Sequence, residues 1–202
     1  MYTIDKSYTF KQIINKSEFI CTVYPVNSVD QINEILTKTR KTYYDATHNC
    51  YAYILGDNGE TAKNSDDGEP SQTAGIVIYE VLRKNQLTNI LAIVTRYFGG
   101  IKLGAGGLIR AYGSSTSNAI KDIQLLKIQK CYIMELNFAY PLLNSINKIT
   151  SNYQELSKDF GNSITMQILI PVEKKEEITK DLISSTKDCI HIKIIKEITK
   201  AM

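Results

Sequence analysis

Residues 66–112 carry the most information in this chain: they read DDGEPSQTAG, then IVIYEVLRKNQLTNILAI, then VTRYFGGIKLGAGGLIRAY. Five glycines fall between Gly99 and Gly107, after a strand-like segment at Asn89–Thr95 and before a helix-like segment at Leu108–Ile120. Glycine allows close approach of the backbone and positive φ angles. Backbone N–H groups at a helix N-terminus attract anions. A strand, a glycine-rich loop and a helix in this order therefore predict an anion-binding site.

The charges around the glycines favour the same interpretation. From Val81 to Lys121 there are six cationic side chains and no carboxylate, whereas Asp57 to Glu69 holds five carboxylates and one lysine. Basic segments with interleaved aromatic residues are typical of contact with RNA phosphates and stacked bases. The predicted binding residues are Arg96, Lys102, Arg110, Gly99, Gly100, Gly104, Gly107, Tyr97 and Tyr112.

A structural alternative remains open for two of the cations. Arg96 and Arg110 could pair with carboxylates of the acidic segment, namely Asp66, Asp67 or Glu69. An arginine that is locked onto a buried carboxylate supports the fold and is not free to bind phosphate.

Two familiar phosphate-binding loops are excluded by the spacing. No Gly-Lys pair is followed by Ser or Thr, so the loop of P-loop NTPases is absent. The stretch from Gly104 to Ile109 fails the dinucleotide fingerprint at its last glycine. The sequence therefore remains consistent only with a generic anion site made of backbone amides and cations.

Composition and charge restrict the class of protein to which this chain can belong. The chain has 202 residues, 43% hydrophobic and 22% charged, which is enough apolar material for a packed core. A net charge of +3 is too small to indicate nucleic-acid binding without a local patch. Two histidines and four scattered cysteines show no zinc-ligand spacing, so no metal or cofactor is expected. With no signal sequence and no membrane-spanning run, we expect a cytoplasmic protein with buried or inert thiols.

Hydrophobic patterns predict an α+β fold in two domains, residues 1–127 and 128–202. The first domain is expected to contain strands at 16–26, 49–55 and 89–95, helices at 28–43, 72–83 and 108–120, and a polar loop at 56–71. Beyond Lys127 the order is strand, helix, strand, strand, helix, strand, with a hairpin at Phe160–Asn162. That βαββαβ order is ferredoxin-like.

Catalytic candidates are few and weak. His48, Asp67 and Glu69 could transfer protons at the anion site. Asp45, His48 and Cys50 lie close in sequence, but Cys50 begins an apolar strand, where cysteine usually acts as a small hydrophobe.

The segments DATHNCYAY (45–53), DDGEPSQTAG (66–75) and VTRYFGGIKLGAGGLIRAY (94–112) resemble the signature of the YigZ branch of the IMPACT family. The resemblance covers about residues 16–122. It implies an N-terminal domain with the fold of a ribosomal-protein second domain, shared with domain IV of elongation factor G. The C-terminal ferredoxin-like domain is similar to domain V of that factor. The chain departs from the family at Gln72, where glycine is usual, and at Tyr51, where tryptophan is common.

Three functions follow from these observations. The first is a non-catalytic protein that binds RNA or the ribosome, as the translation-factor resemblance implies. The second is an enzyme for a small phosphorylated or carboxylated metabolite. The third is a protein-interaction module, because the eukaryotic relatives act in translational control by binding an activator of a stress-responsive kinase.

Overall fold

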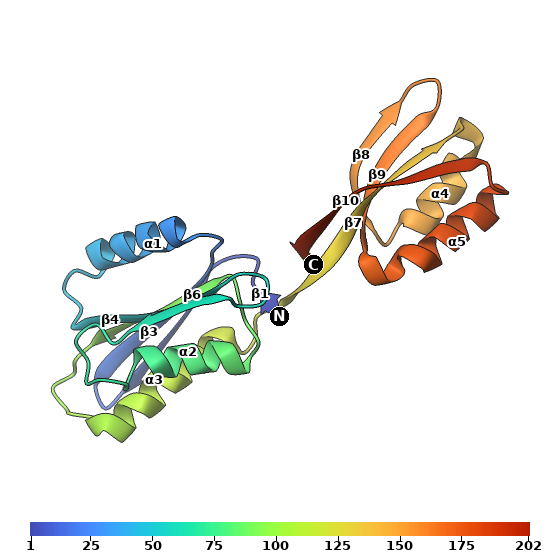
Figure 1. The fold of residues 1–202 in the computed structure, drawn as a ribbon. Helices are drawn as coiled ribbons and strands as arrows, with labels where there is room; N and C mark the ends of the chain where they lie inside the picture. Colours follow the sequence, from blue (N-terminus) through green and yellow to red (C-terminus); the bar gives the residue numbers. More distant parts are fainter. The chain divides into compact units, whose positions relative to one another are not determined.

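The structure is a computed structural model that describes residues 1–202, and it divides into two compact units. One unit comprises Met1–Ile128 and the other Gln129–Lys200. Both combine helices with a sheet (Figure 1), which confirms the predicted α+β class. No helix is both long enough and apolar enough to cross a membrane.

The N-terminal unit is built on a five-stranded sheet in the order β2-β3-β6-β4-β5. All neighbouring pairs of this sheet are antiparallel. The strands are β2 (Tyr8–Ile14), β3 (Ser17–Pro25), β4 (His48–Leu55), β5 (Thr61–Ser65) and β6 (Ile90–Tyr97). A further short strand, β1 (Tyr2–Thr3), pairs with the beginning of β7 at Leu126 and Lys127.

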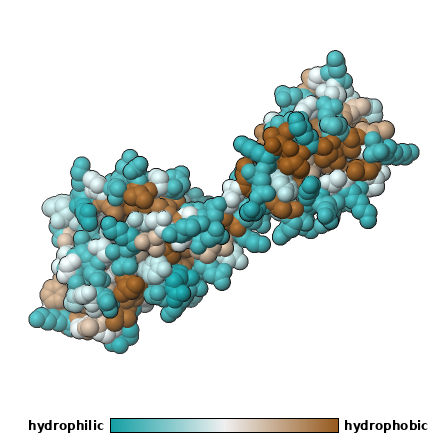
Figure 2. Space-filling view, viewed as in Figure 1, coloured by the Kyte–Doolittle hydropathy of each residue, from teal (hydrophilic) through white to brown (hydrophobic).

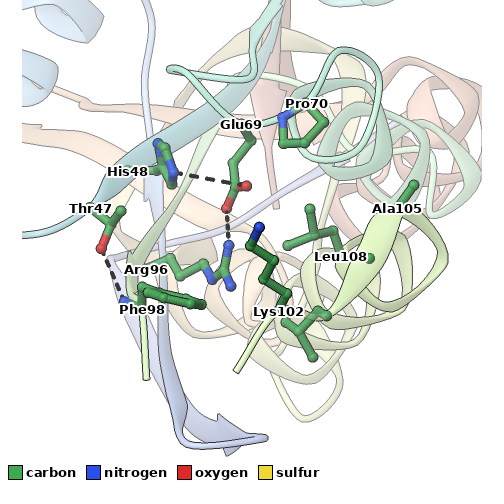
Figure 3. A pocket seen from close by; sticks show the side chains of 11 residues that line it. Thr47, His48, Glu69, Pro70, Arg96, Phe98, Lys102, Ala105 and Leu108 are labelled. Atoms are coloured by element: carbon green, nitrogen blue, oxygen red, sulfur yellow. Dashed lines mark hydrogen bonds and ion pairs between the residues drawn. The ribbon is translucent and has the colours of Figure 1, made fainter. Parts of the chain in front are cut away.

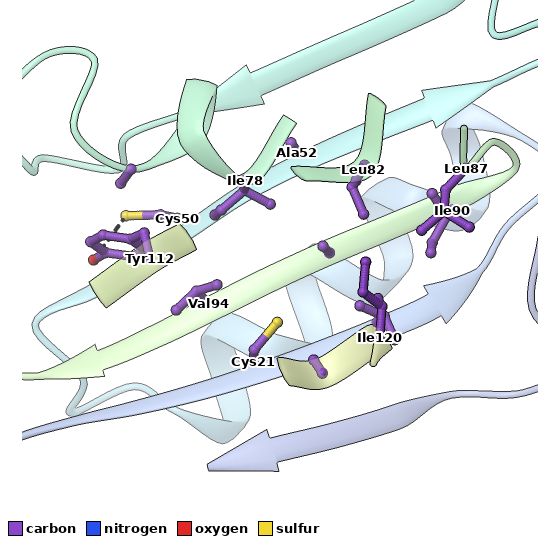
Figure 4. Packing of buried hydrophobic residues seen from close by; sticks show 14 of the residues in the cluster. Cys21, Cys50, Ala52, Ile78, Leu82, Leu87, Ile90, Val94, Tyr112 and Ile120 are labelled. Carbon is purple, nitrogen blue, oxygen red and sulfur yellow. Dashed lines mark hydrogen bonds between the residues drawn. The ribbon is translucent and has the colours of Figure 1, made fainter. Parts of the chain in front are cut away.

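Helices cover both faces of this sheet. Helices α2 (Gly75–Lys84) and α3 (Gly104–Ile120) pack on one face, where Ile78 and Tyr112 meet Cys50 of β4 (Figure 4). Helix α1 (Val29–Thr42) covers the opposite face and packs against alternate residues of β4 and β6. Because both faces are buried, the central strands read as continuous apolar runs and not as an alternating pattern.

Helix α1 begins where the sequence predicts. Its N-cap is Ser28, whose Oγ accepts a hydrogen bond from the Gln31 N–H at 3.2 Å. This bond satisfies one of the N–H groups that have no partner within the helix. Ile32 and Leu36 then fall on the buried face of the helix, four residues apart.

The C-terminal unit has the strand order β10-β7-β9-β8. Its elements are β7 (Leu126–Phe138), α4 (Leu143–Thr150), β8 (Gln154–Phe160), β9 (Ile164–Pro171), α5 (Lys175–Thr186) and β10 (Ile190–Ala201). Short 3₁₀ turns at Tyr140–Leu142 and Val172–Lys174 precede the two helices. Helices and strands follow in the predicted ferredoxin-like order, and their core includes Met134, Ile168 and Leu182. Figure 2 shows apolar side chains gathered on the visible face of this unit.

Three elements differ from the sequence-based expectation. The polar loop predicted at 56–71 contains β5, an exposed edge strand that pairs with β4. Strand β2 was not predicted, and it pairs with β3 across a turn at Asn15 and Lys16. Helix α3 begins at Gly104 and not at Leu108, so three of the glycines form its first turn. Glycine is tolerated there because those N–H groups lack helical partners in any case.

Gly99 is required by packing. A Cβ atom at this position would overlap the backbone of Lys16 in the β2–β3 turn. The Gly99 N–H also donates to Ser17 Oγ at 3.2 Å, which holds the glycine loop against β3. This glycine therefore supports the fold, and its N–H is already occupied by Ser17.

We expect Gly99→Ala to lower the free energy of unfolding by about 1–3 kcal/mol, because the new methyl group must displace backbone. Gly106→Ala is the matched control, since its Cβ would meet only the flexible Arg110 side chain, at 3.6 Å. Urea denaturation monitored by circular dichroism measures the free energy of unfolding of both variants. Equal stability of the two variants would contradict this account of Gly99.

Candidate functional site

A buried ion pair lies at the centre of the candidate site. Arg96 is on β6 and Glu69 is in the segment between β5 and α2, and Arg96 Nη1 lies 2.7 Å from Glu69 Oε1. The two side chains are only 6% and 2% exposed. The structural alternative left open by the sequence is therefore the correct one for Arg96. Its guanidinium is not free at the surface to bind phosphate.

Hydrogen bonds from three other elements complete this pair. Tyr112 of α3 donates from its hydroxyl to Glu69 Oε1 at 2.7 Å, and Cys50 of β4 donates from Sγ to the Tyr112 hydroxyl at 3.3 Å. Arg96 Nη2 donates to Ser17 Oγ on β3 at 3.3 Å. Burial raises the pKa of Tyr112 above its usual range and raises the pKa of Cys50 to about 12. Both groups therefore stay neutral and act as hydrogen-bonding partners.

Aromatic rings flank the guanidinium of Arg96. Its central carbon lies 5.5 Å from the ring centroid of Phe19 and 5.5 Å from that of Phe98. Cations near aromatic rings gain electrostatic stabilisation when they are removed from water. Phe19 is fully buried, whereas Phe98 is 46% exposed. The pair therefore lies directly beneath an exposed aromatic side chain.

Asp66 and Asp67 were the other two candidate partners of Arg96, and each has a different structural role. Asp66 Oδ1 accepts from the N–H groups of Ala74 and Gly75, at 3.0 and 2.8 Å, and so caps the start of α2. Asp66 Oδ2 accepts from the Gln72 N–H at 2.9 Å. Gln72 has φ of 64°, a left-handed conformation that glycine adopts more easily. The backbone role that the family's glycine suggests is thus filled here by glutamine.

Asp67 fixes the position of His48. Asp67 Oδ2 accepts from the Asn49 N–H at 2.7 Å, and its backbone carbonyl lies 2.8 Å from His48 Nδ1. A carbonyl oxygen can only accept, so His48 Nδ1 carries a proton and donates it to this carbonyl. His48 Nε2 lies 3.9 Å from Glu69 Oε2, which is beyond hydrogen-bonding distance.

A pocket of about 460 Å³ opens next to the ion pair (Figure 3). Its polar walls come from Thr47, His48, Glu69, Arg96 and Lys102. Its apolar walls come from Pro70, Phe98, Leu103, Ala105 and Leu108. Two of the three weak catalytic candidates, His48 and Glu69, therefore face one cavity together with Lys102 of the glycine loop, while Asp67 holds His48 from behind.

The remaining predicted binding residues separate into exposed and buried groups. Lys102 and Arg110 are exposed and form no ion pair. Gly100 and Gly104 are exposed, with positive φ and no atom within 4 Å of an added Cβ, whereas Gly107 lies within the first turn of α3. The Tyr97 hydroxyl donates to Asp45 at 2.9 Å. Tyr112 is 0% exposed, so the prediction that its ring stacks on a base is wrong.

Several residues of the site were missed from the sequence. Ser17 and Phe19 reach Arg96 because β3 pairs with β6 in a register that places Phe19 opposite Arg96. Leu103, Ala105 and Leu108 line the pocket because α3 begins early and presents its first turns to it. Neither the register nor the exact start of a glycine-rich helix can be read from residue types.

The model of the Impact N-terminal domain matches residues 15–120, a range that contains the whole of this site. The chain belongs to the IMPACT family. The IMPACT family member YvyE of Bacillus subtilis is 41% identical over 175 residues, which cover 87% of this chain and 81% of YvyE. The IMPACT family member YigZ of Escherichia coli is 28% identical over 193 residues, covering 94% and 95% of the two chains. The predicted membership is thereby confirmed.

A solved structure shows the same architecture in a relative of this IMPACT-family chain. It is a crystal structure of a hypothetical protein, with a TM-score of 0.60 and 27% sequence identity. The match covers 96% of this chain and 97% of that one. The two-unit α+β fold is therefore shared along nearly the full length of both proteins.

We expect the single variants Glu69→Met and Arg96→Met each to lower the free energy of unfolding by about 3–5 kcal/mol, because each leaves a buried charge without its partner. In the double variant, the loss of unfolding free energy should be clearly smaller than the sum of the two single losses. A double-mutant cycle from urea denaturation measures this coupling. Additive losses would contradict the buried ion pair. As a milder comparison, Tyr112→Phe should lower the free energy of unfolding by about 1 kcal/mol, because it removes one hydrogen bond to Glu69.

The four thiols should differ sharply in reactivity. Cys21, Cys50 and Cys131 are buried, whereas Cys189 is exposed. Burial also raises the pKa of Cys21 to about 12, so its reactive thiolate is scarce at neutral pH. A native titration with Ellman's reagent at pH 8 should label one thiol rapidly and all four only in urea. Cys189→Ser should abolish the rapid phase, and a rapid phase that persisted would contradict the structure.

Proposed function

We propose that this chain is a non-catalytic RNA-binding protein that acts in translation or its regulation. It would contact RNA or the ribosome through the surface of the glycine-rich segment, residues 98–110. This segment joins β6 to α3 and includes the first turns of that helix.

The observation that carries the proposal is the pair of free cations beside the start of α3. Lys102 and Arg110 are exposed and form no ion pair. Helix α3 has 17 residues, no side-chain cap and no acidic residue in its first turn. Its unpaired N–H groups and the positive end of its dipole add to the charge of the two side chains. Together these groups attract phosphate.

Exposed apolar side chains accompany the cations. Phe98, Ile101 and Ile109 are 46%, 43% and 44% exposed. An exposed aromatic ring beside a basic surface allows stacking of an unpaired base, and such stacking does not depend strongly on sequence. Single-stranded RNA provides both the phosphates and the unstacked bases for this surface.

The buried ion pair supports the same interpretation indirectly. Because Arg96 is already neutralised by Glu69, the positive charge that is left at this surface belongs to Lys102 and Arg110. Membership of the IMPACT family supports the link to translation, which the resemblance implies through the eukaryotic relatives. A cytoplasmic location is part of the same proposal, since ribosomes act there.

We expect Lys102→Ala and Arg110→Ala each to weaken binding of a single-stranded RNA 20-mer and to reduce the slope of log K against log salt by about 1. Fluorescence anisotropy of a labelled RNA, repeated at several salt concentrations, measures both effects. Lys38→Ala is the matched control, because Lys38 is exposed on α1, which packs on the opposite face of the sheet. An RNA affinity that does not depend on salt, or an equal loss of affinity in all three variants, would contradict the proposal.

A further inference from the structure

The pocket beside the proposed RNA surface is larger and more apolar than a phosphate requires. Its volume of about 460 Å³ lies within the range of roughly 300–1,000 Å³ that is usual for small organic ligands. Pro70, Phe98, Leu103 and Leu108 supply apolar walls from two sides. A flat, weakly polar group such as a nucleobase suits these walls better than a bare anion.

Two hydrogen-bond acceptors face the same end of this pocket. Glu69 Oε1 is occupied by Arg96 and Tyr112, whereas Oε2 accepts no hydrogen bond from the protein. His48 Nδ1–H is held by the Asp67 carbonyl, so the lone pair of a neutral His48 ring lies on Nε2. The two acceptor atoms are 3.9 Å apart. A ligand with neighbouring N–H donors would satisfy both.

Positive groups also line the pocket. Lys102 lines it, and in Figure 3 its side chain extends toward the cavity. Gly104 and Ala105 begin α3 there, with open space around Gly104. The pocket thus combines hydrogen-bond acceptors with groups that attract phosphate.

We propose that this pocket binds one unstacked guanine nucleotide of a single-stranded RNA, an inference that rests on the proposed RNA-binding function. Guanine presents two adjacent N–H donors, N1–H and the N2 amino group, with the O6 acceptor beside them. The donors match Glu69 Oε2 and, with its ring neutral, His48 Nε2. Adenine, cytosine and uracil each lack the second adjacent donor. The phosphate of the same nucleotide contacts Lys102 and the N-terminus of α3.

The experiment uses the full chain with guanosine 5′-monophosphate (GMP), adenosine 5′-monophosphate (AMP) and labelled single-stranded RNA. GMP should compete with a guanine-containing RNA at a concentration about tenfold lower than AMP, the discrimination expected for paired hydrogen bonds to one base edge. On GMP addition, the methyl NMR signals of Leu108 should shift, because Leu108 lines the pocket. The NMR measurement needs no variant.

Ala105→Phe should fill the pocket from an exposed position of α3, abolish GMP binding and lower the affinity for guanine-containing RNA by about tenfold. Its affinity for an all-adenine RNA should not change. Asn118→Phe is the matched control, since Asn118 is exposed on the same helix, lies outside residues 98–110 and does not line the pocket. Thermal melting verifies that both variants are folded.

The outcomes separate this inference from the proposed function. Salt-dependent RNA binding without preference for GMP, or GMP binding that Ala105→Phe leaves unchanged, overturns the guanine pocket and leaves the RNA-binding function intact. GMP binding that shifts Leu108 without any RNA binding overturns the proposed function and supports the chemistry of the pocket. If the chain binds neither GMP nor RNA, both the guanine pocket and the proposed function are overturned.

Discussion

The Glu69–Arg96 ion pair is the interaction on which the N-terminal unit depends. Removing two charges from water is unfavourable unless each is paired and hydrogen-bonded. Here the bonds come from Tyr112 on α3 and Ser17 on β3 as well as from the pair itself. The acidic segment, two strands and one helix are therefore joined at one point, and the pocket wall is built from the same groups.

This arrangement divides the cations of residues 96–110 into two kinds. Arg96 is buried and neutralised, and it organises the site from within. Lys102 and Arg110 remain in solvent near the N-terminus of α3, where neither has an acidic partner. A segment that looks uniformly basic in sequence thus contains one structural cation and two that are free for ligands. The glycines divide in the same way, since Gly99 packs on Lys16 while Gly100 and Gly104 face open space.

Much of the fold could be predicted because its signals are local. Ser28 caps α1 as its residue type suggests, and the apolar runs of β4 and β6 indicate strands buried on both faces. The order of elements after Lys127 gives the ferredoxin-like unit. Strand β5 could not be predicted, because Thr61–Ser65 is an exposed edge strand held by backbone pairing to β4 and carries no apolar pattern. The early start of α3 was hidden by glycines, which have low helix propensity.

The sequence by itself determined the family, the α+β class, and the presence of an acidic segment next to a basic, glycine-rich one. Only the tertiary structure decided how Asp66, Asp67 and Glu69 of the acidic segment are used. Asp66 caps α2, Asp67 holds His48 and the start of β4, and Glu69 pairs with Arg96. The physical reason is that a carboxylate's role depends on which donors the folded chain brings to it. Residue type and spacing place Asp66, Asp67 and Glu69 in one short segment, but strand register and helix position set their partners.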